Sequence, residues 1–142
     1  KLYMGWSTSA NEYGINADRM CYTAAECYIR TGEIRKGLEL VDRVRAKRVE
    51  NYEPFVALYD QQALSEEEAM ALLQKAKWIE CISTYENFFD CKRWNSEEKY
   101  KRVITRNLGE YGTYSIGPDS PLWVLPFPAN ATRYNPSLTQ NY

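Results

Sequence analysis

The turn at Gly32 is the sequence feature that most restricts how this chain can fold. Apolar residues recur every three or four positions from residue 17 to residue 29, and the same period resumes at Ile34. Between the two stretches, "RTGE" (30–33) places a glycine where a left-handed residue commonly ends a helix. Two helices joined by so short a turn pack antiparallel. We therefore predict a helical hairpin over residues 17–48, preceded by a loop over residues 1–16.

The spacing inside this hairpin predicts how its helices meet. Two apolar stripes lie side by side on the first helix: Met20, Ala24, Cys27 and Tyr28 on one, and Tyr22, Ala25 and Ile29 on the other. Small residues at 25 and 37 let the helices approach, and we expect Tyr28 to be buried in the groove between them. Gly37 stands where alanine is usual, at a cost of about 1 kcal/mol in helix propensity. The spacing is similar to that of a tetratricopeptide unit, whose apolar face needs further chain to cover it.

The longest helical pattern runs from residue 65 to residue 94. Before it, "NYEPFVALYDQQAL" (51–64) is predicted to be a loop, because Pro54 disfavours a helical conformation at the residue before it. Ser65 and Glu68 have the spacing of a capping box. Two apolar stripes follow, one of Ala69, Leu72, Leu73, Ala76, Ile79 and Ile82 and one of Trp78, Cys81, Tyr85 and Phe88. This pattern predicts one long helix that is packed on both sides, in the middle of a larger body.

The last third of the chain has little helical period. "NSEEKYKRVITRNL" (95–108) predicts at most a short helix capped at Ser96, and residues 109–142 contain five of the six prolines. We expect an extended tail with a brief strand at 122–125, pinned over the helices so that Trp123, Leu125 and Phe127 are covered. The predicted fold is thus mostly all-α: a tetratricopeptide-like hairpin, a long central helix and an extended Pro-rich tail. We expect it to be a fragment of a larger single domain.

Composition excludes several kinds of chemistry. The chain has no histidine, which removes the commonest general base and the commonest metal ligand. No C-x-x-C pair is formed by the four cysteines, which are Cys21, Cys27, Cys81 and Cys91. We therefore expect buried thiols and no bound metal, and a disulfide between two of them remains an alternative. With 18 basic and 19 acidic residues, no net field attracts nucleic acid, and the basic residues of 43–48 are expected on a solvated helix end. No catalytic residue and no cofactor are predicted.

Two motifs carry a resemblance to a known family. The long helical pattern ends in "FFDCKRW" (88–94), and the chain closes with "LWVLPFPANATRYNPSLTQNY" (122–142). After a helical hairpin and a loop, this order resembles the C-terminal part of the SusD/RagB family, surface lipoproteins of Bacteroidetes that capture nutrients for a TonB-dependent outer-membrane transporter. The matching residues are Phe89, Asp90, Lys92, Arg93 and Trp94 in the first motif and Leu125, Pro126, Pro128, Asn135, Pro136, Leu138, Gln140, Asn141 and Tyr142 in the second.

The sequence also departs from the family's pattern. Asn16 and Arg19 stand where the family usually carries Arg and Glu, although Glu80 on the predicted long helix is kept. The Glu-Gly that often precedes the corner is replaced by Thr and Tyr at 84–85. These departures leave the class of ligand more open than the fold.

The resemblance implies a non-enzymatic protein that binds glycan, or in some members peptide, for a SusC-like transporter at the outer membrane. The lipid anchor would be attached at a cysteine outside this segment. It also implies that residues 88–94 form a structural corner, with Phe89 and Trp94 as an apolar plug and an internal ion pair between Asp90 and either Arg93 or a neighbouring residue. Phe88 and Phe89 are too apolar for a solvent-exposed elbow, which agrees with this interpretation.

Candidate ligand contacts come from the aromatic residues of the unpatterned opening. Tyr3, Trp6 and Tyr13 have side chains of the kind that stack on sugar faces, although most aromatic residues are core. Two other functions are considered: a tetratricopeptide-like scaffold that binds a protein or peptide, suggested by the hairpin alone, and a hydrolase. No motif places the pair of carboxylates that glycoside hydrolysis would need.

Overall fold

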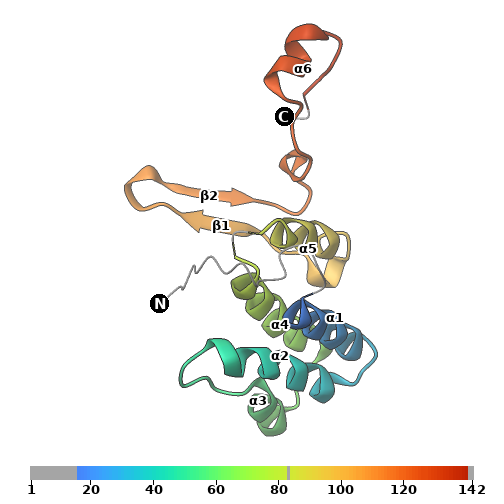
Figure 1. The fold of residues 1–142 in the computed structure, drawn as a ribbon, viewed down its shortest axis with the longest axis vertical. Helices are drawn as coiled ribbons and strands as arrows, with labels where there is room; N and C mark the ends of the chain where they lie inside the picture. Colours follow the sequence, from blue (N-terminus) through green and yellow to red (C-terminus); the bar gives the residue numbers. More distant parts are fainter. Residues whose placement is uncertain (1–15, 83, 141–142) are drawn as a thin grey trace. The chain divides into compact units, whose positions relative to one another are not determined.

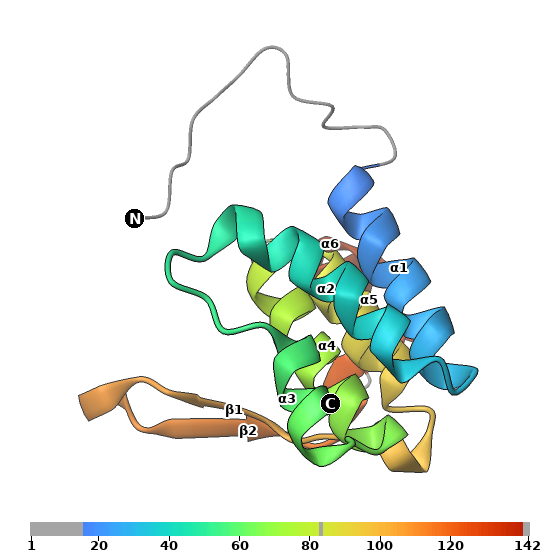
Figure 2. The ribbon, with the colours of Figure 1, turned by 90° about the horizontal axis from the view of Figure 1, so that it is seen from below.

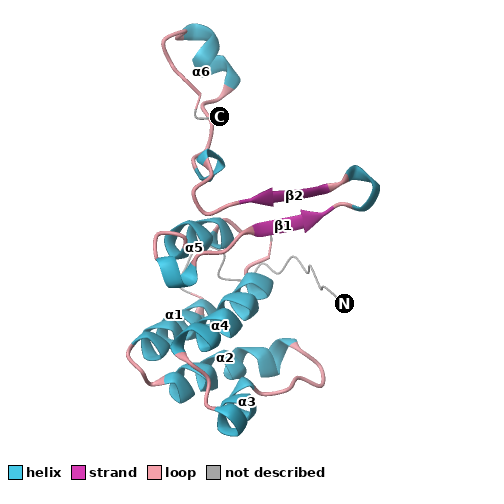
Figure 3. Ribbon diagram, turned by 180° about the vertical axis from the view of Figure 1, so that it is seen from behind, coloured by secondary structure: helices cyan, strands magenta, loops and turns pink. Residues whose placement is uncertain are grey.

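The computed structural model describes residues 16–82 and 84–140, and these two stretches belong to two separate compact units. The described part is mostly helical, with six α-helices and one two-stranded sheet (Figures 1 and 3). This confirms the predicted all-α class. Tyr3, Trp6 and Tyr13 lie outside the described residues.

Four helices build the first unit. They are α1 (Ala17–Arg30), α2 (Ile34–Arg48), α3 (Phe55–Gln62) and α4 (Glu66–Glu80). Helices α1 and α2 form the predicted hairpin, α4 packs against both of them, and α3 packs against α2 (Figure 2). The core of this unit is therefore the space enclosed by α1, α2 and α4.

The turn at Gly32 has the predicted left-handed conformation. Its φ is +86°, which a glycine adopts without strain. The backbone N–H of Glu33 donates to the carbonyl of Tyr28 (2.9 Å), and the N–H of Gly32 donates to the carbonyl of Ile29 (3.1 Å). These two bonds are those of a Schellman motif, so the end of α1 is closed by its own backbone.

The buried stripe of α1 differs from the expectation for Tyr28. Tyr22, Ala25 and Ile29 are buried, whereas 37% of Tyr28 is exposed and the Lys36 ammonium lies 5.5 Å from the centre of its ring. Met20 and Cys27, on the same predicted stripe, are also exposed. The stripes are neighbours on the helix, and Ile29 is the side chain that meets Gly37. The prediction that Tyr28 fills the groove is therefore wrong.

Residues 55–62 form a helix and not the predicted loop. Pro54 is the N-cap of α3 and has no side-chain hydrogen bond to offer. The cap comes from α2: the backbone N–H groups of Phe55 and Val56 each donate to a carboxylate oxygen of Asp42, both at 3.0 Å. Because the capping residue lies on another helix, local sequence could not reveal it.

Arg45 completes this attachment of α3. Its Nη1 donates to Asp42 at 2.8 Å and to the backbone carbonyl of Glu53 at 2.8 Å. The guanidinium carbon lies 3.6 Å from the centre of the Phe55 ring, in a cation–π contact. Arg45 is therefore a half-buried packing residue, and the expectation that it sits on a solvated face is wrong.

The predicted long helix is two helices. Helix α4 begins with the predicted capping box, since the Ser65 N–H donates to the Glu68 carboxylate and the Glu68 N–H donates to Ser65 Oγ. It ends at Glu80, and α5 begins only at Glu86. Ile82 and Thr84 lie between the two helices, and β-branched residues favour a helix less than the alanine and leucine residues of α4 do. Ile79, Ile82 and Tyr85, which the continuous pattern expected to be packed, are exposed.

The second unit contains more structure than an extended tail. After α5 (Glu86–Trp94) come short 3-10 turns η1 (Glu98–Tyr100), η2 (Gly109–Tyr111) and η3 (Pro121–Trp123) and a last helix, α6 (Ala129–Tyr134). Strands β1 (Ile104–Asn107) and β2 (Thr113–Ile116) pair antiparallel, with Ile104 opposite Ile116. The short helix expected at Ser96 is only the turn η1, and the strand expected at 122–125 is absent.

Buried and exposed side chains do not alternate along the tail as they would in the expected strand. Trp123 is buried, but 73% of Leu125 is exposed and Phe127 is exposed as well. The Trp123 ring lies 5.6 Å from the ring of Phe88 on α5, and its Nε1 donates to the carbonyl of Gly117 at 2.8 Å. One of the three predicted contacts is therefore present, and the alternating strip is not.

The contact between Gly37 and Ile29 yields a prediction on stability. A Cβ at residue 37 would lie 2.5 Å from Ile29 Cγ1 and 2.8 Å from the carbonyl oxygen of Ala25. Gly37→Ala should therefore destabilise the protein by about 1–3 kcal/mol, as overpacking does, although alanine favours a helix. Urea denaturation measures this, and Ala46→Gly on the exposed side of α2 should show the cost of propensity alone. A more stable Gly37→Ala variant would contradict the close approach.

A second prediction concerns Asp42. Asp42→Ala removes the cap of α3 and the partner of Arg45, so we expect a loss of about 2 kcal/mol, the upper range for a lost cap. Asp60→Ala, which removes an exposed partner of Arg35, is the matched control and should change stability little. Urea denaturation compares the two, and hydrogen exchange should show that residues 55–62 lose protection first. Equal stability of both variants would contradict the capping role.

Candidate functional site

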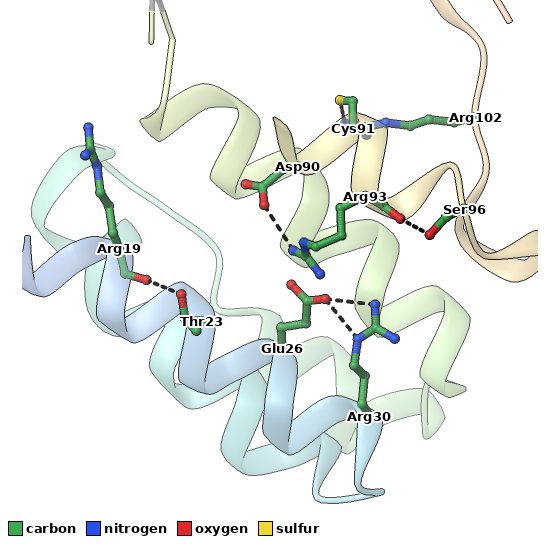
Figure 4. A network of polar contacts seen from close by, with 9 residues as sticks. All are labelled: Arg19, Thr23, Glu26, Arg30, Asp90, Cys91, Arg93, Ser96 and Arg102. Atoms are coloured by element: carbon green, nitrogen blue, oxygen red, sulfur yellow. Dashed lines mark hydrogen bonds and ion pairs between the residues drawn. The ribbon is translucent and has the colours of Figure 1, made fainter. Parts of the chain in front are cut away.

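The predicted corner at residues 88–94 is the last turns of α5. Arg93 Nη2 lies 3.0 Å from Asp90 Oδ1, which is the expected internal ion pair (Figure 4). Asp90 and Trp94 are buried, and only 2% of Trp94 is exposed. Phe89, by contrast, is 63% exposed, so it is not part of the plug. Phe88 takes that role through its contact with Trp123.

Arg102 closes the corner from the chain that returns after η1. Its backbone N–H donates to Asn95 Oδ1 at 3.4 Å, and its Nη2 donates to Cys91 Sγ at 3.6 Å (Figure 4). Its guanidinium carbon lies 5.8 Å from the centre of the Trp94 ring. Burial raises the pKa of the Cys91 thiol, and Arg102 opposes that rise in part. The role of Arg102 could not be predicted from the sequence, because no residue near it in the chain indicates a contact with α5.

The second motif folds on itself. The side-chain amide of Gln140 accepts from the N–H of Phe127 (3.1 Å) and donates to the carbonyl of the same residue (3.0 Å). Phe127 lies between two prolines, and proline has no backbone N–H. Of these three residues, only Phe127 can therefore both donate and accept a backbone hydrogen bond. Asn135 Oδ1 accepts from the backbone and the hydroxyl of Ser137, in an Asx-type turn around Pro136. Gln140 and Asn135 thus have structural roles.

A shallow groove of about 460 Å³ lies where α2 begins. It is lined by Gly32, Glu33, Ile34, Arg35, Lys36, Glu39 and Tyr59. Arg35 pairs with Asp60 at 3.2 Å and with Glu39, and Lys36 pairs with Glu33. The groove therefore offers a polar surface with one aromatic ring, suited to a polar ligand, and its cations are already paired within the chain.

A smaller hollow of about 50 Å³ lies among α1, α2 and α4. Arg48 at the end of α2 borders it and joins both neighbouring helices: Nε lies 3.1 Å from Glu80 Oε1, and Nη2 bonds Asp18. Tyr22 on α1 forms another wall. Burial, and then the negative charge of Glu80, raise the pKa of the Tyr22 hydroxyl far above its usual value.

No disulfide joins the four cysteines. Cys81 and Cys91 are buried as expected, but Cys21 is only half-buried and Cys27 is exposed. Within residues 16–82 and 84–140, no group of three or more Cys, Asp or Glu side chains is arranged to hold a metal ion. In the same residues no helix has the length and apolar character needed to cross a membrane.

The chain matches no family model, no curated protein and no solved structure.

The corner predicts a sharp contrast between two aromatic neighbours. Trp94→Ala should destabilise the protein by about 3 kcal/mol or more, because it empties a buried site. Phe89→Ala, five residues earlier and exposed, should change stability by well under 1 kcal/mol. Thermal and urea denaturation of the two variants provide the comparison. If Trp94→Ala unfolded like the parent protein but lost a ligand, the corner would be a binding site and not a structural element.

Proposed function

We propose that this chain is the C-terminal part of a SusD-like protein that binds nutrient glycans for a TonB-dependent transporter. In this proposal it acts at the surface of the outer membrane, held there by a lipid anchor outside the segment. It is not an enzyme in this proposal, and it needs no cofactor and no nucleic acid. The ligand is an oligosaccharide or polysaccharide.

The observation that carries the proposal is that both motifs make defined internal contacts. In the first motif, Trp94 is buried and Asp90 pairs with Arg93. In the second motif, Gln140 binds both backbone groups of Phe127. The residues that match the family's pattern also hold their own segments together, and this structural role gives a physical reason for the pattern. This favours a shared fold over a chance match of letters.

The polar chemistry of the chain agrees with binding and not with catalysis. The sequence has no histidine. The charged residues that line the groove at the start of α2 are held in ion pairs. They therefore do not supply a separate general acid and general base of the kind that catalysis uses. The proposal therefore assigns recognition to this protein and transport to its partner.

A tetratricopeptide-like scaffold that binds a peptide is the second candidate, including a peptide-binding member of the same family. It is favoured by one observation, the hairpin of α1 and α2, with its Schellman turn at Gly32 and its close approach at Gly37. Tetratricopeptide arrays bind extended peptides along stacked hairpins. A single hairpin supplies only part of such a surface.

The test uses the full-length protein that contains this segment. Calorimetry against a panel of oligosaccharides and peptides should show glycan binding, and product analysis should show no cleavage. Affinity purification from the outer membrane should recover a TonB-dependent transporter. Binding of peptides alone would favour the second candidate, and cleavage of a glycan would contradict a purely binding function.

The isolated 142-residue segment serves as the matched control. We expect it to bind glycan weakly or not at all and to be prone to aggregation, because it leaves large apolar side chains such as Ile79, Ile82 and Tyr85 exposed. Sedimentation velocity and calorimetry measure both properties. A monodisperse segment with micromolar glycan affinity would place the binding site within these residues.

A further inference from the structure

The groove at the start of α2 has walls that come from the hairpin turn, from α2 and from α3. Gly32 and Glu33 form the turn, Ile34, Arg35, Lys36 and Glu39 lie on the first two turns of α2, and Tyr59 lies on α3. All of them belong to the first unit. The volume of about 460 Å³ falls within the range of roughly 300–1,000 Å³ that small-molecule sites occupy.

Contacts at both ends of α3 hold it in place as a wall of the groove. At its start, Asp42 accepts hydrogen bonds from two backbone N–H groups, both at 3.0 Å. Near its end, the Arg35 guanidinium contacts the Asp60 carboxylate twice, with Nε 3.2 Å from Oδ1 and Nη2 3.3 Å from Oδ2. Such a bidentate pair fixes the geometry better than a single contact does. Tyr59 is the neighbour of Asp60 in the chain, so its position relative to α2 is defined by this pair.

The polar side chains of the groove can bind further groups while they keep their ion pairs. Arg35 has five N–H groups and uses three of them, two on Asp60 and one on Glu39. The Glu39 carboxylate accepts that bond at one oxygen, which leaves lone pairs for other donors. Lys36 donates to Glu33 and has further donors on the same ammonium. A ligand with many hydroxyl groups, which both donate and accept, matches this surface.

The charges around the groove favour a neutral ligand. Two cations, Arg35 and Lys36, pair with three carboxylates, those of Glu33, Glu39 and Asp60. An anionic ligand would therefore meet an excess of one negative charge. A cationic ligand would have to displace an arginine or a lysine from a carboxylate that already binds it. An uncharged molecule meets neither obstacle.

We propose that this groove is a glycan subsite for an uncharged sugar unit, with Tyr59 as its aromatic contact and Arg35 and Glu39 as partners of the sugar hydroxyl groups. A sugar ring carries C–H groups that pack on an aromatic side chain and hydroxyl groups that bond polar ones. The subsite rests on the proposed glycan-binding function and adds to it a location and a preference for uncharged sugars. Because the groove is shallow, it is an additional subsite for a long glycan chain and binds weakly by itself.

Glycan affinity of the full-length protein tests the role of Tyr59. The probe is the tightest-binding member of a neutral set that consists of soluble starch, xylan and galactomannan. Tyr59→Ala should weaken its binding by about two- to tenfold, the range for the loss of one aromatic contact. Tyr59→Phe keeps the ring and should bind within about twofold of the parent protein. Tyr134→Ala removes an aromatic residue of α6 that is 81% exposed, and as the matched control it should leave the affinity unchanged.

A second pair of variants keeps the test independent of any effect of Tyr59→Ala on folding. Glu39→Ala removes an exposed carboxylate of the groove, so it should weaken neutral-glycan binding by about twofold or more while the melting temperature stays the same. Glu50→Ala, at an exposed position after α2, is its control and should change neither property. The parent protein should bind the acidic polysaccharide polygalacturonate more weakly than the neutral probe. Glu39→Ala should narrow that difference, because it removes negative charge.

The possible outcomes separate the subsite from the proposed function. If Tyr59→Ala and Glu39→Ala both bound the neutral probe like the parent protein, the subsite would be wrong and the glycan-binding function would stand. If the parent protein bound no glycan, both would be overturned. Loss of affinity for a peptide, with glycan affinity unchanged, would make the groove a peptide site and would also overturn the subsite.

Discussion

The close contact of Ile29 with Gly37 determines how the first unit is built. Because no Cβ stands at residue 37, α2 can lie against the backbone of α1, and Ile29 fills the space that a side chain would take. Helices α3 and α4 are both attached to α2 as well. Asp42 and Arg45 hold α3, and Arg48 holds the end of α4 and the start of α1. The charged C-terminal half of α2 therefore connects to α3 through Asp42 and Arg45, and to α4 and α1 through Arg48.

Signals that lie within a few residues of each other could be predicted from the sequence. The Gly32 turn and the Ser65–Glu68 capping box depend on spacings of at most three residues, and the structure contains both. The structure also contains an ion pair between Asp90 and Arg93, which the family resemblance had implied for Asp90 with Arg93 or a neighbour. The assignment of Tyr28 to the groove failed for a different reason. Adjacent stripes on a helix are separated by a single position, and only the partner helix decides which of them is buried.

Features that join distant residues could not be read from local pattern. Helix α3 depends on a carboxylate that lies 13 residues before Phe55, and the corner of α5 depends on Arg102, which lies 11 residues after Cys91. The hairpin of β1 and β2 was missed because the Pro-rich composition after it suggested extended chain throughout. Residues proposed as ligand contacts, Tyr3, Trp6 and Tyr13, belong to a stretch outside the described residues.

The bond between Gln140 and Phe127 has a consequence for how the segment between them can vary. The two hydrogen bonds hold the ends of this loop together, with no strand pairing and no covalent link between them. For a flexible loop with fixed ends, each doubling of length costs only about 0.6 kcal/mol in closure entropy. Related chains can therefore differ in the length and composition of the part that contains α6 while the base of the loop stays the same. Such a loop is a place where surface recognition can change between proteins at little cost to folding.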